Sequence, residues 1–166
     1  MKIKNIKLDD IDLFIFDFDG VLTDNKVYLD QKGNEFVSCN RSDGMGFVVL
    51  NKIKKKVYII STEKNKVVAA RAKKLKVPAI YGVNKKYEVI KKLSKKINLN
   101  FKRIFYIGND LNDYEAMKLC GYSACPSDSH KRIKKIATFV LDAKGGSGVV
   151  RELLEKIFKL NLLKYL

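Results

Sequence analysis

Short apolar runs alternate along the chain with longer amphipathic stretches. The apolar runs have the length of strands, and the amphipathic stretches repeat their apolar positions every three or four residues, as helices do. The pattern predicts strands at residues 13–16, 57–60, 79–81, 104–107, 122–124 and 139–141. It predicts helices at residues 44–54, 65–76, 85–97, 111–119, 129–136 and 148–163. Ser42 or Asp43 is expected to cap the first helix, because serine and aspartate are common N-caps.

Strands that alternate with helices indicate an α/β fold in which helices cover both faces of a parallel sheet. The order therefore predicts one Rossmann-like three-layer domain over residues 1–166. A second feature interrupts it: two short apolar runs flank the polar, glycine-containing segment 30–34, which predicts a β-hairpin at residues 26–39. Ligands of such sheets bind beyond the carboxyl ends of the strands. Polar clusters that follow strands are therefore the candidate site.

The most informative polar cluster follows the first predicted strand and reads FDFDGVLTD at residues 16–24. Asp17 and Asp19 lie two residues apart, so their carboxylates repel one another unless a cation lies between them. Oxygen ligands suit Mg²⁺. Because Asp-Gly is common in turns, Asp19 and Gly20 alone would indicate no more than an acidic turn.

Three further polar clusters follow strands or begin helices later in the chain. Ser61-Thr62-Glu63 offers hydroxyls and backbone N–H groups that suit phosphate oxygens. Lys85 and Lys86 begin a predicted helix, and YIGNDLND at residues 106–113 places acids and amides after a strand. Each cluster has an ordinary explanation as well, either as a helix cap or as solvated lysines in a lysine-rich chain.

The four clusters in this order resemble the haloacid dehalogenase superfamily of phosphatases over nearly the whole chain, and residues 17–24 are the most specific part. The resemblance implies that Asp17 attacks phosphorus and forms an aspartyl-phosphate, while Asp19 serves as general acid and then general base. It implies that Ser61 and Lys86 hold the phosphoryl group. Lys86 is preferred to Lys85 because it lies nearer the apolar face of its helix.

The resemblance also implies Mg²⁺ as cofactor, held by the Asp17 carboxylate and the backbone carbonyl of Asp19. The last ligand comes from the segment Gly108-Asn109-Asp110, where close relatives have an acid in place of Asn109. Either Asn109 binds the metal more weakly, or Asp110 takes its place. Asp113 would support these ligands from behind.

The chain has no room for a cap domain, either between residues 24 and 61 or between residues 61 and 86. It resembles the capless group of 3-deoxy-manno-octulosonate 8-phosphate phosphatases, both in the hairpin at 26–39 and in the tail KGGSGVVRE at 144–152. The resemblance implies a homotetramer in which the hairpins form a central barrel and the glycine-rich tail reaches the site of a neighbouring subunit.

The candidate substrate-binding residues are Thr62, Glu63, Arg71 and Lys74. Glu63 stands where enzymes for the eight-carbon substrate have arginine, and with Arg71 and Lys74 it resembles phosphatases of nine-carbon 2-keto-3-deoxy acids, such as sialic acid or KDN 9-phosphate. Arg71 or Lys74 would meet the sugar carboxylate from an adjacent subunit, although a solvated helix face explains both equally well.

Two alternatives to a nine-carbon sugar phosphatase stay open. One is the octulosonate 8-phosphate phosphatase itself. The other is an oligomerisation module like the domain at the end of some sialic acid cytidylyltransferases. Asn109 favours the second alternative, which is opposed by the retention of four residues, Asp17, Asp19, Ser61 and Lys86.

The net charge of +16 comes from lysines spread along the whole chain, without basic motifs interleaved with aromatic residues. Charge of this kind does not by itself predict a nucleic-acid partner, and it suits an anionic sugar phosphate equally well. No apolar run has the length of a membrane span, and the N-terminus has no signal-peptide pattern. Three cysteines without a CxxC pair indicate reduced thiols in a cytoplasmic protein.

Overall fold

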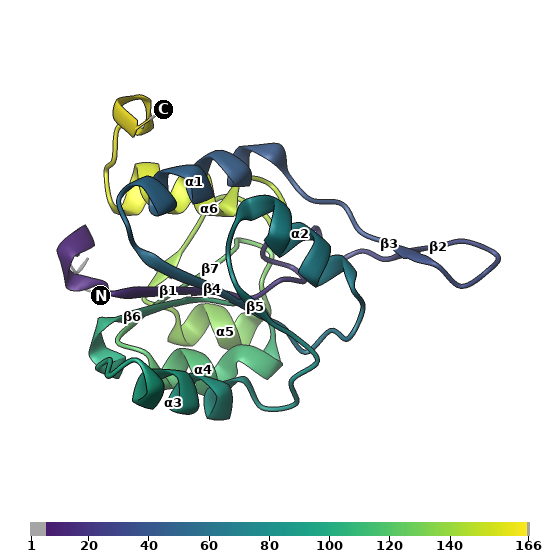
Figure 1. Ribbon diagram of the computed structural model, residues 1–166, viewed down its shortest axis with the longest axis horizontal. Helices are drawn as coiled ribbons and strands as arrows, with labels where there is room; N and C mark the ends of the chain where they lie inside the picture. Colours follow the sequence, from purple (N-terminus) through teal and green to yellow (C-terminus); the bar gives the residue numbers. More distant parts are fainter. Residues whose placement is uncertain (1–5, 166) are drawn as a thin grey trace.

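The computed structural model describes residues 6–165 and shows a parallel sheet between two layers of helices (Figure 1). The strand order is β5-β4-β1-β6-β7-β8. The strands are β1 Leu13–Phe16, β4 Lys56–Ile60, β5 Ala79–Ile80, β6 Ile104–Ile107, β7 Tyr122–Cys125 and β8 Phe139–Val140. The main helices are α1 Arg41–Lys52, α2 Val67–Leu75, α3 Lys86–Lys96, α4 Tyr114–Leu119, α5 Lys131–Ile136 and α6 Val149–Glu152. This arrangement confirms the predicted Rossmann-like α/β fold.

The central strand β1 is buried on both faces. Phe14 and Phe16 pack into the core under α1, α2 and α6, whereas Leu13 and Ile15 pack into the core under α3, α4 and α5 (Figure 1). A strand that is apolar on both faces belongs in the middle of a parallel sheet. β1 pairs with β4 on one side and with β6 on the other, so its carboxyl end lies where the strand order reverses.

The predicted cap of α1 is wrong. Asn40 is the N-cap, and its Oδ1 accepts a hydrogen bond from the Ser42 N–H at 2.8 Å. Asp43 instead turns inward, and its Oδ1 accepts a hydrogen bond from the Val150 N–H at 2.8 Å. Asn40, Ser42 and Asp43 are all residue types that cap helices well, so the local sequence does not show which of them is the N-cap. In the structure Asp43 bonds to the start of α6 and is not available as a cap.

The predicted single helix at 148–163 is also wrong. α6 ends at Glu152 and continues as a π-helical turn, Leu153–Ile157, before Lys159 adopts a left-handed conformation with φ of 53°. A separate 3₁₀ turn follows at Leu162–Tyr165. Apolar residues recur through this region, so their pattern alone does not show that the backbone breaks between them. Likewise, the predicted helix at 111–119 begins as a 3₁₀ turn, Leu111–Asp113, before α4.

A two-stranded hairpin projects from the body of the domain (Figure 1). It consists of β2 Tyr28–Leu29 paired antiparallel with β3 Glu35–Phe36. Its apolar side chains are more than half exposed, namely Val27, Tyr28, Leu29 and Phe36. Between residues 24 and 61 the chain forms this hairpin, α1 and β4, so no cap domain stands there. Among residues 6–165, no helix combines the length and the apolar character needed to cross a membrane.

Two glycines of α1 are expected to respond oppositely to substitution by alanine. In Gly44→Ala the new Cβ meets nothing closer than Leu75 Cδ2 at 3.9 Å, so we expect the free energy of unfolding to rise by about 0.5–1 kcal/mol. In Gly46→Ala the Cβ lies 2.8 Å from Val150 Cγ1, and we expect a loss of about 1–3 kcal/mol. Urea unfolding of both variants measures the difference. Equal stabilities would contradict the close packing of α1 on α6.

Candidate active site

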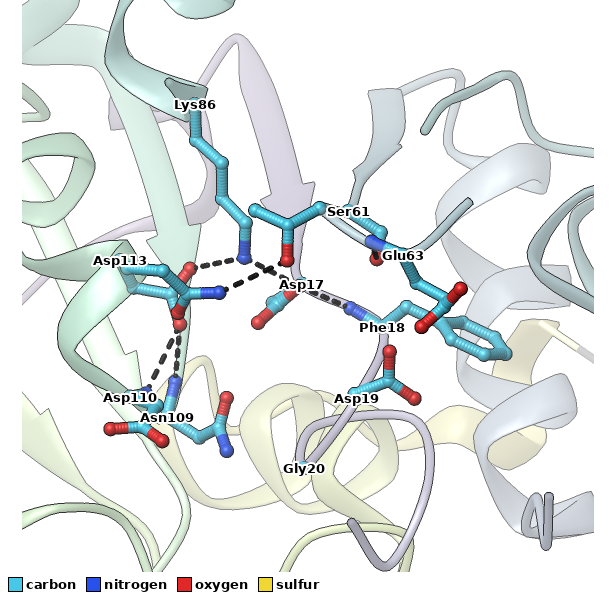
Figure 2. A network of polar contacts seen from close by, with 12 residues as sticks. Asp17, Phe18, Asp19, Gly20, Ser61, Glu63, Lys86, Asn109, Asp110 and Asp113 are labelled. Carbon is cyan, nitrogen blue, oxygen red and sulfur yellow. Dashed lines mark hydrogen bonds and ion pairs between the residues drawn. The ribbon is translucent and has the colours of Figure 1, made fainter. Parts of the chain in front are cut away.

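The carboxyl ends of β1, β4 and β6 meet the start of α3, and this brings the polar clusters of the sequence together (Figure 2). Asp17 follows β1 directly, and its backbone N–H donates to the Ile107 carbonyl at 2.9 Å. Ser61 follows β4, Lys86 is the first residue of α3, and Asn109 follows β6. All four side chains are buried, although Ser61 and Asn109 are polar and the other two are charged.

Lys86 lies inside the site, where its ammonium group bonds to two carboxylates. Its Nζ is 2.7 Å from Asp17 Oδ1 and 2.7 Å from Asp113 Oδ1. Burial alone lowers the pKa of Lys86, but the charges of Asp17 and Asp113 outweigh burial and raise that pKa above the ordinary lysine value. Lys85, by contrast, is exposed and lies 3.4 Å from Glu88. The structure therefore places Lys86, and not Lys85, beside Asp17.

Each carboxylate oxygen of the buried Asp113 accepts two hydrogen bonds, and these hold the neighbouring groups of the site in place. Oδ1 accepts from Lys86 and from the Tyr106 hydroxyl, each at 2.7 Å. Oδ2 accepts from the backbone N–H groups of Asn109 at 2.8 Å and Asp110 at 3.2 Å. Sequence reasoning missed Tyr106. The available signal was a tyrosine in a fully buried strand, since a buried phenol requires a hydrogen-bond partner.

The two carboxylate oxygens of Asp17 differ in their bonding, although the residue as a whole is buried. Oδ1 accepts from Lys86 and from the Phe18 N–H, each at 2.7 Å, whereas Oδ2 makes no such bond to any of residues 6–165. Burial, followed by the charge of Asp113, raises the pKa of Asp17 well above the ordinary aspartate value, and Lys86 opposes this effect. The buried carboxylate therefore needs further positive charge to stay ionised.

Asp19 lies at the mouth of the site on the loop that follows β1 (Figure 2). The Thr23 hydroxyl donates to Asp19 Oδ1 at 3.4 Å. Partial burial and then the charge of Glu63 raise the pKa of Asp19 above its ordinary value. A carboxyl group with a raised pKa retains its proton more readily, as a general acid must.

The residues after β4 line the side of the site opposite Asn109 (Figure 2). The Ser61 hydroxyl is buried and accepts from the Glu63 N–H at 3.0 Å. The Thr62 hydroxyl accepts from Asn112 Nδ2 at 3.3 Å, which links the segment after β4 to the turn at Leu111–Asp113. One oxygen of Glu63 accepts from the N–H groups of Lys64 and Asn65, which fixes its carboxylate near Asp19.

Asn109 and Asp110 differ in where their side chains point. An alanine Cβ at Gly20 would lie only 1.9 Å from Asn109 Nδ2, so this glycine lets Asn109 lie against the loop that carries Asp19. Asp110 is exposed and points away from Asp17, and its Oδ1 accepts from the Leu111 N–H at 2.7 Å as a cap (Figure 2). Of the two residues, Asn109 is the one beside the Asp17–Asp19 loop.

The donor set fits a divalent cation. Three carboxylates gather here, those of Asp17, Asp19 and Asp113, and Lys86 contributes one positive charge to them. If all are ionised, an excess of two negative charges remains. Among residues 6–165, no three His, Cys, Asp or Glu side chains are arranged to hold a metal. A cation here would draw on the Asp17 carboxylate, the Asn109 amide oxygen and a backbone carbonyl, which are oxygen ligands that suit Mg²⁺.

The structure does not place Arg71 and Lys74 beside Asp17. They line a groove of about 400 Å³ between α1 and α2, together with Arg41. Arg71 Nη2 donates to the Asn40 carbonyl at 2.7 Å. In the described part of the chain, no hydrogen bond or ion pair links either residue to the cluster around Asp17.

The glycine-rich segment, which was expected to reach the site of a neighbouring subunit, contacts the first loop of its own chain, and its relation to other subunits stays a prediction. Gly145 and Gly146 pack on the chain's own loop after β1, and the Gly146 N–H donates to the Val21 carbonyl at 3.0 Å. Glycine permits a flexible chain, but it also permits close contact between backbones, and Gly145 and Gly146 make such contacts here.

Comparisons with known proteins give a consistent result. A family model of haloacid dehalogenase-like hydrolases matches residues 50–153. The 3-deoxy-D-manno-octulosonate 8-phosphate phosphatases KdsC of Salmonella typhi and Escherichia coli K12 are each 33% identical over 147 residues, which cover 88% of this chain and 78% of each enzyme.

Solved structures match over nearly the whole chain. A Streptomyces avermitilis protein described as a HAD family hydrolase has a TM-score of 0.93 and 37% identity, covering 96% of this chain and 92% of its own. The 3-deoxy-D-manno-octulosonate 8-phosphate phosphatase of Moraxella catarrhalis, solved in complex with magnesium ion, phosphate ion and KDO, has a TM-score of 0.86 and 29% identity, covering 90% and 87%.

Proposed function

The chain belongs to the haloacid dehalogenase-like hydrolases and is a phosphoric monoester hydrolase, and we propose that Asp17 is its nucleophile. The environment of Asp17 carries this proposal. Its carboxylate stands at the end of the central strand, with Oδ1 fixed by Lys86 and the Phe18 N–H while Oδ2 is available for attack. Such fixed geometry is what nucleophilic catalysis requires.

The proposed reaction has two steps. Asp17 Oδ2 attacks phosphorus, the bond from phosphorus to the sugar oxygen breaks, and Asp19 gives its proton to that oxygen. Asp19 then takes a proton from a water molecule, which attacks phosphorus, releases phosphate and restores the Asp17 carboxylate. Ser61 and Lys86 bind the phosphoryl oxygens throughout, so their hydrogen bonds stabilise the charge of the transition state.

The proposed cofactor is Mg²⁺, held by the Asp17 carboxylate, the Asp19 backbone carbonyl and the Asn109 amide oxygen. Bound Mg²⁺ offsets the negative charge of the phosphate and of the surrounding carboxylates. We assign Asn109 rather than Asp110 because Asp110 is exposed and caps the turn at Leu111. The Moraxella catarrhalis relative was solved with a magnesium ion and a phosphate ion, which supports Mg²⁺ as the cofactor.

The proposed substrate is the phosphate monoester of a 2-keto-3-deoxy sugar acid, and specifically a nine-carbon acid such as sialic acid or KDN 9-phosphate. Glu63 supports the nine-carbon acid, since its fixed carboxylate at the mouth suits a polyol or amide donor. The names of the curated relatives support the eight-carbon 8-phosphate instead. A non-catalytic oligomerisation module is disfavoured, because a buried lysine between two carboxylates is costly to keep without a use.

We expect Glu63→Arg to reverse part of this preference. The arginine removes an acceptor for sugar hydroxyls, so kcat/KM for the nine-carbon 9-phosphate should fall roughly tenfold or more relative to the eight-carbon 8-phosphate. Phosphate release from both substrates, with and without Mg²⁺, measures the ratio in the wild type and the variant.

Glu88→Arg is the matched control for this experiment, since it makes the same charge change on the exposed face of α3. An unchanged substrate ratio in Glu63→Arg would remove Glu63 from specificity. Failure of the wild type to hydrolyse either sugar acid would contradict the proposed substrate class.

We also propose a homotetramer in which the hairpin at residues 26–39 forms the subunit contacts. The exposed Val27, Tyr28, Leu29 and Phe36 provide its apolar surface. In such a tetramer Arg71 and Lys74, which lie away from Asp17 of their own chain, could bind the sugar carboxylate at the site of a neighbouring subunit.

We propose a reducing, cytoplasmic location, which the three unpaired thiols support.

We expect Leu29→Lys to dissociate the tetramer, because it places a charge in the proposed apolar contact. Analytical ultracentrifugation measures the oligomeric state. Leu163→Lys is the control, since Leu163 is 82% exposed but lies outside the hairpin. A monomeric wild type at micromolar concentration would contradict the proposal.

A further inference from the structure

The glycine-rich segment 142–148 lies against the loop 18–24 that carries Asp19. A Cβ at Gly145 would lie 2.4 Å from the Gly20 carbonyl oxygen and 3.0 Å from that of Thr23. A Cβ at Gly146 would lie 2.6 Å from the Asp24 nitrogen. Backbone therefore touches backbone at both ends of the loop, at distances that no other residue type permits.

Carboxylates anchor this segment by accepting hydrogen bonds from its backbone. Asp128 Oδ1 accepts from the Gly145 N–H at 3.0 Å. Glu152 accepts from the N–H groups of Asp142 at 2.9 Å and Ala143 at 2.6 Å. Asp43 accepts from Val150 just beyond the segment. The segment is thus fixed along its length, although residues 142–148 form neither strand nor helix.

The loop 18–24 in turn controls the orientation of Asp19. The Thr23 hydroxyl accepts from the N–H groups of Gly20 and Asn25, each at 3.2 Å, and donates to Asp19 Oδ1. A displacement of the backbone at Gly20 or Thr23 therefore moves the donor that orients the Asp19 carboxylate. Gly145 covers the carbonyl groups of these same two residues.

We propose that segment 142–148 is a rigid brace for the loop 18–24, and that Gly145 and Asp128 are positioning residues for Asp19. This inference rests on the proposed function, because it assigns the brace to the residue that protonates the departing sugar oxygen. The brace acts through Gly20 and Thr23, and neither Gly145 nor Asp128 touches the reacting atoms.

The test uses the dependence on the leaving group. A misplaced general acid slows the hydrolysis of esters whose leaving group must be protonated, such as glycerol phosphate. It hardly affects the hydrolysis of p-nitrophenyl phosphate, because p-nitrophenolate departs unprotonated. In Gly145→Ala and Asp128→Ala we expect kcat/KM to fall about 10–100-fold for glycerol phosphate and less than about threefold for p-nitrophenyl phosphate. Asp128→Asn should retain nearly full activity, since its amide oxygen still accepts from the Gly145 N–H.

Asp142→Ala is the control within the brace itself, because its side chain is 84% exposed and pairs with Lys156, while its backbone N–H keeps its bond to Glu152. An equal loss on both esters, or no loss, would overturn the positioning role. Hydrogen exchange gives a second readout without turnover: amides of residues 18–25 should exchange at least about threefold faster in Gly145→Ala. Unchanged exchange would overturn the brace. A wild type that hydrolyses neither these esters nor the sugar acid phosphates would refute the proposed function, and hydrogen exchange would still decide on the brace.

Discussion

Asp17→Asn is expected to reduce phosphate release by about 10⁴–10⁶-fold while leaving the fold intact. The amide that replaces the carboxylate is not a nucleophile, and it also removes one negative charge from the cation site. The fold survives because asparagine has nearly the same shape, and Lys86 keeps its bond to Asp113. Phosphate release at saturating Mg²⁺ and thermal unfolding, measured on the same preparation, test both parts of this expectation.

Asp12→Asn is the matched control, since it makes the same chemical change at the opposite end of β1, where Asp12 pairs with Arg103. Its activity should equal that of the wild type. Normal turnover by Asp17→Asn would remove Asp17 from the mechanism. Loss of activity together with loss of the folded state would leave no evidence for a nucleophile.

Lys86→Met should lower both activity and stability. It leaves the buried carboxylates of Asp17 and Asp113 without their shared cation, which is expected to cost about 3–5 kcal/mol in the free energy of unfolding. Folding raises the pKa of Lys86 above the ordinary lysine value. The ion pairs therefore contribute in full to the free energy of unfolding below the ordinary lysine pKa, and this contribution is lost as the pH rises through the raised pKa. Denaturant unfolding near pH 7 measures the cost.

Lys85→Met is the control, since Lys85 is adjacent in sequence but exposed, and it should change stability by less than about 0.5 kcal/mol. Adding Asp113→Asn to Lys86→Met should recover part of the stability without restoring activity. A stable Lys86→Met protein would contradict the ion-pair arrangement.

The sheet and the residues that meet at its edge were predictable because they depend on strong local signals. Residues 13–16 and 104–107 are apolar throughout, which places both strands centrally, and the acids and amides after them then converge by topology alone. The preference for Lys86 over Lys85 follows from helical periodicity, since one position faces the apolar side of α3 and the other does not.

Other features depend on contacts between distant segments, which no local pattern encodes. Asp43 does not cap α1 but accepts from the N–H of Val150, more than a hundred residues away in sequence. Tyr106 reads as an ordinary strand residue until Asp113 is placed beneath it. Gly145 reads as part of a flexible tail until the Gly20 carbonyl is found beside the space where its Cβ would be.

The burial of Lys86 makes its amine chemically distinct from those of the surface lysines. Only 1% of Lys86 is exposed, so an acylating reagent such as acetic anhydride should modify the exterior amines long before it reaches Lys86. Mild acylation would thus remove much of the +16 charge while sparing the reaction centre. The resulting change in kcat/KM would show how strongly the positive electrostatic field of the protein speeds its association with an anionic substrate.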